Sequence, residues 1–206
     1  MNQTIQGRAR ELAKEMTAPL AQALKRVTAE RDLLREQSTH HGLTGLFNKD
    51  GLKQAFQSEV RRLVREWRKR NESDRPDVFL IMLDLDNFKQ ANDRLGHAHG
   101  DTVLQVIAEL MRKHLGKRPG DLLGHPHGDE FVVVLPDATS AYVQEHAHAF
   151  LTAIRSDVRL DLRESGFRVT ASIGVAVGNI DHTRPVIDAE VGIFLQELLA
   201  QADKAM

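Results

Sequence analysis

The sequence predicts an α+β sandwich, in which helices pack on a central, mainly antiparallel sheet. Residues 78–85 form a nearly unbroken apolar run, as expected for a central strand that is buried on both faces. Residues 122–135 form two apolar runs on either side of His127-Gly128-Asp129, which is typical of a β-hairpin. Segments with apolar residues at helical spacing precede and follow these strands, so helices are available to cover the sheet.

The predicted elements follow in the order helix, strand, helix, hairpin, helix, strand and helix. The first helix covers Lys49–Arg70, and its apolar face consists of Leu52, Phe56, Val60, Leu63 and Trp67. Polar turn residues then fill positions 71–76. After the central strand, we expect helices at Thr102–His114, Ser140–Arg155 and Glu190–Met206, and a last strand at Phe167–Val177. The sequence contains no internal repeat and no low-complexity tract.

The first forty residues differ in character from the rest. Apolar residues at helical spacing stand at Leu20, Leu24, Val27 and Leu34, which are separated by four, three and seven residues. The seven-residue interval lacks its intermediate apolar residue, because Arg31 occupies that position. This spacing lays a narrow stripe along a helix, as a dimerising coiled coil needs. A solvated helix packed on its own domain fits the same spacing, because the stripe is shorter than three heptads. We therefore expect an N-terminal helical linker or coiled coil over 1–40 and a folded domain over 41–206.

The composition is that of a soluble globular protein and excludes several classes of function. The 28 basic and 29 acidic residues nearly cancel, so no basic field predicts nucleic-acid binding. The absence of cysteine excludes disulfides, thiolate zinc sites and cysteine nucleophiles. No apolar run approaches the roughly 18 residues of a membrane helix, and the N-terminus is too polar for a signal peptide. We therefore expect a cytoplasmic protein.

Acidic residues stand at the end of the central strand and in the predicted hairpin. Asp84 and Asp86 close the strand, whereas Asp129 and Glu130 lie at the turn. The carboxylates either face solvent or cap the next helix, or they converge at one edge of the sheet. In the second case they suit Mg²⁺, which binds through one or two carboxylates together with substrate phosphates.

A dense polar segment, residues 86–101, connects the central strand to the next helix. Residues 87–89 are expected to turn off the strand into a short helix, which presents backbone N–H groups and the Lys89 ammonium to an anion. Asp101 either takes part in such a site or caps the helix that follows. The side chains that can recognise the edge of a nucleobase are Asn92, Asp93, His97 and Asp101.

These residues carry a resemblance to a known family. The strings DLDNFKQANDRLGHAHGDTVL, HGDEFVVVLP and GLTGLFNKDGL resemble the GGDEF family, the diguanylate cyclases, and the similarity covers about residues 43–206. The resemblance implies a five-stranded sheet flanked by helices, like palm and nucleotide-cyclase domains, with an N-terminal signalling helix. It also implies that two domains, each holding one GTP, meet face to face and form cyclic di-GMP with release of two pyrophosphates.

The resemblance also implies a role for each residue at a matching position. Mg²⁺, or Mn²⁺ in its place, would be held by Asp84, Asp129 and the backbone carbonyl of Leu85. The catalytic residues would be Asp129, as general base for the ribose 3′-hydroxyl, together with Glu130 and Lys89. The residues that bind GTP would be Phe88, Lys89, Asn92, His97 and Asp101. An inhibitory site for the product would be formed by the RxxD residues Arg118 and Asp121, for which a solvated turn is the alternative.

The sequence departs from the family pattern at three places. His127 replaces the first glycine of the signature, where a tight turn often needs a positive φ and where an imidazole can crowd the nucleotide. His41 and His125 stand where the family has Asp and Arg; we interpret the family's two residues as a salt-bridged pair that has been exchanged together in this sequence. The sequence given stops at Met206, before the family residues whose cationic side chains contact the GTP phosphates. We therefore expect some of these phosphate contacts to be missing.

Two other interpretations stay open. A catalytically degenerate domain would bind cyclic di-GMP or GTP, or act as a dimerisation module, without turnover. The second is a zinc site formed by histidines that are spaced two residues apart. None of these pairs has i, i+4 spacing or a visible third ligand. The pairs are His97 and His99, His125 and His127, and His146 and His148. The expected partners are GTP, cyclic di-GMP and a second copy of the chain, which would pair through the N-terminal helix and the active-site faces.

Overall fold

The structure is a computed structural model that describes residues 17, 19, 21–31, 34, 36, 38–70, 77–162 and 167–206. The chain divides into two compact units, residues 1–38 and 39–206. Residues 21–31 of the first unit are helical. Along this unit Leu24, Val27 and Leu34 are 66%, 63% and 58% exposed, so the apolar stripe is not buried, whereas Leu20 lies outside the described residues.

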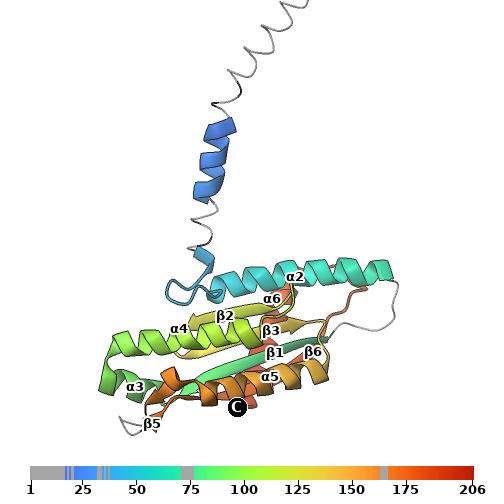
Figure 1. Cartoon of the computed structure of the whole chain (residues 1–206). Helices are drawn as coiled ribbons and strands as arrows, with labels where there is room; N and C mark the ends of the chain where they lie inside the picture. Colours follow the sequence, from blue (N-terminus) through green and yellow to red (C-terminus); the bar gives the residue numbers. More distant parts are fainter. Residues whose placement is uncertain are drawn as a thin grey trace, which may run out of the picture. The chain divides into compact units, whose positions relative to one another are not determined.

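The second unit is an α+β sandwich around a four-stranded antiparallel sheet (Figure 1). The strand order is β2-β3-β1-β6. The strands are β1 (Asp77–Asp86), β2 (Leu122–His127), β3 (Glu130–Pro136) and β6 (Thr170–Asn179). The predicted central strand is therefore central, since β3 and β6 pair with β1 on its two sides. The predicted hairpin is the β2–β3 pair.

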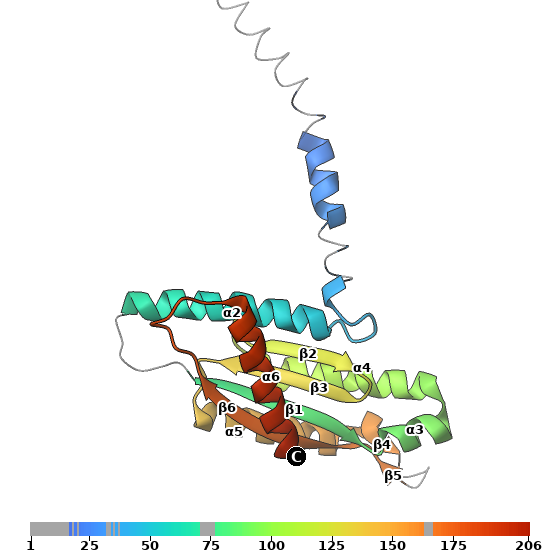
Figure 2. The same ribbon diagram turned by 180° about the vertical axis from the view of Figure 1, so that it is seen from behind.

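Helices cover both faces of the sheet, as Figure 1 and Figure 2 show from opposite sides. One face carries α3 (Phe88–Leu95), α4 (His97–His114) and α5 (Ser140–Ser156), and the other carries α2 (Lys49–Arg70) and α6 (Asp188–Lys204). Side chains of a strand alternate between faces. Accordingly, Ile81 and Leu83 of β1 pack in the α4–α5 core, whereas Val78 and Leu80 pack in the α2–α6 core.

The sheet differs from the expected one in the number of strands. Among the described residues four strands form the main sheet, whereas the resemblance implies five. The short strands β4 (Asp161–Leu162) and β5 (Phe167–Arg168) pair only with each other. The predicted strand 167–177 is divided into β5 and β6 at Val169, which pairs in the ladder of neither strand. Val169 is fully buried, and its N–H donates to the carbonyl of Leu160.

The prediction for the helix after the central strand is also adjusted. The helix predicted at Thr102 begins at His97, because Gly96 has a φ of 84° and turns the chain directly from α3 into α4. Asp101 therefore lies inside α4 and does not cap it. The predicted turn at 71–76 lies outside the described residues. No helix in the described ranges has both the length and the apolar character that a membrane span requires.

Candidate active site

The strand register brings the two acidic clusters to the same end of the sheet. Asp84 of β1 lies directly opposite Glu130 of β3 in the antiparallel ladder. Residues opposite each other in such a ladder share a face, with Cβ atoms about 5 Å apart. Asp129 immediately precedes Glu130 in the turn between β2 and β3. The predicted convergence of carboxylates therefore follows from the topology.

The charge of Asp84 is not offset within the described part of the chain. Burial raises the pKa of Asp84 above its ordinary value, and the negative charges of Asp129, Glu130 and Asp86 raise it further. The neighbouring Asp86 is different, because it accepts hydrogen bonds from Thr170 Oγ1 at 2.7 Å and Ser172 Oγ at 2.8 Å. Asp84 is thus the carboxylate of the strand end whose negative charge a bound cation would stabilise.

This donor set fits a magnesium ion. The described residues contain no cluster of three His, Asp or Glu side chains arranged to hold a metal, and so give no support to a histidine zinc site. Mg²⁺ does not require such a cage, since it commonly takes one or two carboxylates and completes its shell with water and phosphate oxygens. Asp84, Asp129 and the Leu85 carbonyl offer only hard oxygen donors, and their surplus negative charge favours a divalent cation.

The hairpin turn accommodates His127 without backbone strain. The residue with a positive φ is Gly128, at 61°, and not His127, so the expected cost of a left-handed histidine is absent. The His127 side chain is 65% exposed, and its Nδ1 lies 3.0 Å from Oε2 of Glu130. The imidazole therefore contacts a carboxylate that is proposed to support catalysis.

The predicted nucleotide-binding residues lie on α3 and α4. Phe88 and Lys89 form the first turn of α3, which starts directly after the end of β1, and the Lys89 side chain is exposed. The Asn92 side chain packs on Gly100 of α4, where an added Cβ would lie only 1.9 Å from Asn92 Oδ1. The next residue on α4 is the exposed Asp101. His97, which is also exposed, begins the same helix.

The RxxD residues form a closed turn. Arg118 Nε and Nη2 donate to Asp121 Oδ1 at 3.0 and 2.8 Å, and the Asp121 side chain is fully buried. The Arg118 guanidinium also donates to the carbonyls of Pro136 and Asp137 at 3.0 and 2.9 Å, and it lies 4.6 Å from the ring centroid of Tyr142. In this conformation the two residues bond to each other, and a ligand would have to compete with that pairing.

Comparison with known proteins decides the family. The family model described as "Diguanylate cyclase, GGDEF domain" matches residues 38–206. The chain belongs to the GGDEF family. A crystal structure of the coiled coil and GGDEF domain of DgcB from Caulobacter crescentus, in complex with c-di-GMP, has a TM-score of 0.68 and 22% identity, and the match covers 93% of this chain and 91% of that one. At this identity the likeness shows the fold.

Two curated relatives extend the comparison. Diguanylate cyclase DgcP of Pseudomonas aeruginosa is 32% identical over 173 residues, which is 84% of this chain and 24% of that protein. Cyclic di-GMP phosphodiesterase PdeB of Shewanella oneidensis is 32% identical over 185 residues, which is 88% of this chain and 19% of that protein. The chain thus spans about a quarter or less of the length of these relatives.

His41 and His125 of this GGDEF domain are in direct contact. The ring centroids of His41 and His125 lie 4.0 Å apart. Sequence reasoning pairs these two positions but misses Thr44, whose Oγ1 lies 3.2 Å from His125 Nδ1 across 81 residues of sequence. It also misses Gly100, the contact of Asn92. The only sequence signal for either residue is its place within a string that resembles the family, because no local periodicity points to a long-range contact.

Protonation of His125 is expected to make the stability of the domain depend on pH. Burial lowers the pKa of His125 below its ordinary value; the bond to Gly128 opposes this shift, and the neighbouring His41 adds to it. Below pH of about 6.5 the unfolded chain binds a proton that the folded state binds less readily, so the free energy of unfolding should fall as the pH is lowered. Urea unfolding between pH 8 and pH 5 measures this slope.

The matched variant is His125→Phe, which should flatten the slope. Some dependence on pH should persist, since burial also lowers the pKa of His114. Equal slopes for the variant and the wild type would contradict the assignment to His125.

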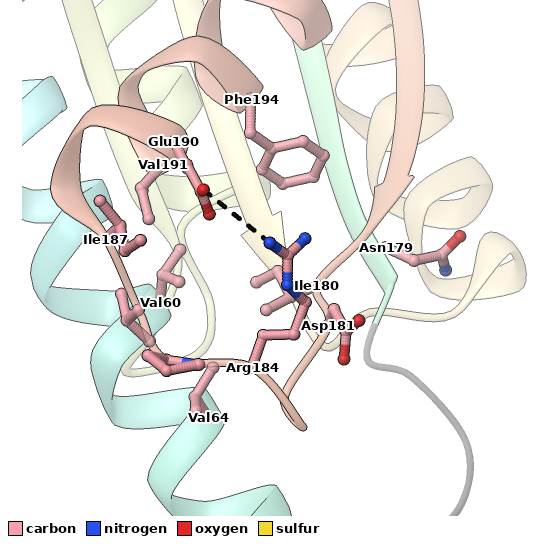
Figure 3. A pocket seen from close by; sticks show the side chains of 12 residues that line it. Val60, Val64, Asn179, Ile180, Asp181, Arg184, Ile187, Glu190, Val191 and Phe194 are labelled. Carbon is pink, nitrogen blue, oxygen red and sulfur yellow. Dashed lines mark ion pairs between the residues drawn. The ribbon is translucent and has the colours of Figure 1, made fainter.

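The α2–α6 side of the GGDEF domain is hollowed near the hairpin and near the start of α6. One hollow, of about 520 Å³, adjoins the hairpin and is lined in part by Lys49, Lys53, His127 and Glu130. A second hollow, of about 250 Å³, lies between α2 and the loop that leads into α6, where the Arg184 guanidinium extends across the opening toward Glu190 (Figure 3). None of the predicted site residues lines the second hollow, and Glu130 is the one that lines the first; Asp84 and Asp129 line neither.

Proposed function

We propose that this GGDEF domain is a Mg²⁺-dependent diguanylate cyclase, with Mn²⁺ as an alternative metal, that condenses two GTP molecules into cyclic di-GMP and releases two pyrophosphates. The observation that supports it most is the position of Asp84 opposite Glu130 and beside Asp129 at one sheet end. The surplus negative charge there favours a divalent cation, and a triphosphate can share the coordination of that cation.

The reaction consists of two phosphoryl transfers. In each, the ribose 3′-oxygen of one GTP bonds to the α-phosphorus of the other, and the bond from that phosphorus to pyrophosphate breaks. Asp129 takes the proton of the attacking hydroxyl, while Glu130 supports the site from the neighbouring position. A metal held by Asp84, Asp129 and the Leu85 carbonyl supplies charge neutralisation and alignment of the attacking and leaving oxygens.

The α3–α4 corner would hold the nucleotide. The first turn of α3 directs backbone N–H groups of Phe88 and Lys89 toward the phosphates, and the Lys89 ammonium adds a positive charge. Guanine presents N1–H and N2–H donors that the Asp101 carboxylate can accept, and O6 and N7 acceptors for the Asn92 amide. His97 lies one helical turn before Asp101 on α4.

Incubation of the chain with GTP and Mg²⁺, followed by chromatography of the nucleotides, tests this function. We expect one cyclic di-GMP for every two pyrophosphates and no product in the presence of a chelator. Recovery of unchanged GTP under conditions where GTP is shown to bind would overturn the cyclase assignment.

A non-catalytic GGDEF domain is the second candidate, and two observations favour it. The His127 imidazole contacts the Glu130 carboxylate, with Nδ1 3.0 Å from Oε2, which leaves this carboxylate less available to support a metal site. In addition, a region similar to this chain occurs in PdeB, a protein named for the hydrolysis of cyclic di-GMP. Such a domain would bind cyclic di-GMP or GTP, or act as a dimerisation module, without synthesis.

Arg118→Ala should weaken cyclic di-GMP binding at least about tenfold, since hydrogen bonds to a charged group contribute roughly 1.5–3 kcal/mol. Isothermal titration calorimetry measures the affinity. Arg118→Lys is the matched control for charge, because it keeps the cation but loses the planar fork. The free energy of unfolding must be measured alongside, because Arg118 also bonds the carbonyls of Pro136 and Asp137. Unchanged affinity in the Ala variant would show that the product does not bind at RxxD.

We further propose that the domain acts as a homodimer, paired through the N-terminal helix. The support is the exposed stripe of Leu24, Val27 and Leu34. The double variant Leu24→Glu, Val27→Glu should convert the dimer to a monomer in sedimentation velocity and reduce synthesis, since each domain supplies one GTP. Ala29→Glu places one such charge away from the stripe and should leave the dimer intact. A double variant that stays dimeric would refute this interface.

A further inference from the structure

A buried histidine supports the turn that carries Asp129. His125 is fully buried in the core of the hairpin. Its Nε2 lies 2.9 Å from the carbonyl oxygen of Gly128, and its ring stacks on Phe131 with centroids 4.3 Å apart and planes 14° apart. On the other edge of the ring, Nδ1 lies 3.2 Å from Thr44 Oγ1. Both ring nitrogens therefore have a partner.

The two partners define the tautomer of His125. A carbonyl oxygen only accepts hydrogen bonds, so Nε2 must carry the proton and donate to Gly128. In a neutral imidazole Nδ1 is then an acceptor, and the Thr44 hydroxyl donates a hydrogen bond to it. Thr44 is itself anchored, because Arg112 of α4 donates to its carbonyl. The imidazole thus connects the turn to a fixed part of the domain.

The two ends of the turn are joined to each other, because His127 pairs with Glu130 in the ladder and its Nδ1 lies 3.0 Å from Glu130 Oε2. Gly128, between them, has a φ of 61°, and a Cβ added there would meet no atom within 4 Å, so the turn is open in that direction. The Asp129 side chain also has no hydrogen-bond partner among the residues that the structure describes. The bond from His125 to the Gly128 carbonyl is a side-chain hydrogen bond that restrains the backbone directly before Asp129.

We propose that His125 is a positioning residue for the reaction: it holds the Gly128 carbonyl, fixes the place of Asp129, and ties this turn to Thr44. The proposal rests on the proposed cyclase function. Thr44 and His41 belong to the segment that follows the N-terminal unit in the sequence. A displacement of this segment would therefore be transmitted to the turn through the His125 ring.

Two variants separate positioning from packing. His125→Phe keeps a ring to stack on Phe131 but has no donor, whereas His125→Gln keeps an N–H at the position of Nε2. We expect the Phe variant to lower kcat roughly tenfold to a hundredfold with the KM for GTP changed less than about threefold, because small displacements of a catalytic group cost this much. The Gln variant should retain kcat within about threefold of the wild type.

Unfolding by urea is measured for both variants. If His125 only supports packing, kcat will follow stability, and the Phe variant will be the more active of the two. That order, or a Phe variant with the kcat of the wild type, would overturn the proposal.

A readout without turnover separates this proposal from the cyclase assignment. Nitrogen-15 NMR of labelled histidine should show His125 protonated at Nε2, and the Asp129 and Glu130 amide resonances should shift in the Phe variant but much less in the Gln variant. If the wild type makes no cyclic di-GMP, the cyclase function is refuted. The NMR measurement still tests whether His125 positions the turn that carries Asp129. An Nδ1–H tautomer, or equal amide shifts in both variants, would overturn the proposal.

Discussion

Asp84→Asn should abolish cyclic di-GMP synthesis while leaving the domain at least as stable as the wild type. The rate should fall at least about a thousandfold, because the loss of a metal ligand removes several kcal/mol of transition-state stabilisation. Stability should not fall, since Asp84 is repelled by Asp129, Glu130 and Asp86 and asparagine relieves this repulsion. Pyrophosphate release and urea unfolding at pH 7 measure the two effects.

The matched control lies two residues away on the same strand. Asp86→Asn should lower stability, because the Asp86 carboxylate accepts two hydroxyl hydrogen bonds, from Thr170 and Ser172. Synthesis should largely persist, since this carboxylate is engaged within the sheet. If both variants lose stability to the same extent, Asp84 is a structural carboxylate; a wild-type rate in Asp84→Asn would remove it from the metal site.

Gly100→Ala should raise the KM for GTP roughly tenfold or more, because bidentate recognition of a base is worth about 1–3 kcal/mol. An added Cβ would lie 1.9 Å from Asn92 Oδ1, so the amide must turn away from its present position. Initial rates at varied GTP concentration, with unfolding measured in parallel, separate a loss of binding from a loss of fold. The stability should change little, since alanine favours a helix by up to about 1 kcal/mol and offsets part of the displacement.

Gly192→Ala provides the comparison. It introduces the same methyl group into α6, where the nearest atom is Lys53 Cε at 3.6 Å, an ordinary contact. This variant should stabilise the domain by about 0.5–1 kcal/mol and leave the KM unchanged. Equal KM values for Gly100→Ala and the wild type would mean that Asn92 does not recognise guanine.

The elements that the sequence predicts well are those with strong local patterns. The helix at Lys49–Arg70 matches α2 at both ends, because its apolar face repeats over six turns. The hairpin is found where the sequence His127-Gly128-Asp129 separates Leu122-Leu123 from the β-branched run of Val132, Val133 and Val134. In contrast, α4 begins five residues earlier than expected, since Gly96 allows a helix start that apolar periodicity does not mark.

The candidate site is predictable in its residue types but not in its hydrogen bonds. Asp84 and Asp129 are recognisable from the resemblance, and the antiparallel register explains their convergence. Spacing along the chain does not encode the hydrogen bonds that Asp86 accepts from two hydroxyl groups. It also does not encode the bond that Arg118 donates to Asp121. The same limit hides the contact between His125 and Thr44.

A crystal structure of the domain with Mn²⁺ and a non-hydrolysable GTP analogue tests the central claim most directly. We expect an anomalous peak coordinated by Asp84, Asp129 and the Leu85 carbonyl, in contact with phosphate oxygens of the analogue. Bound analogue with Mn²⁺ at another place, or with the two carboxylates turned away from the ion, would contradict the account.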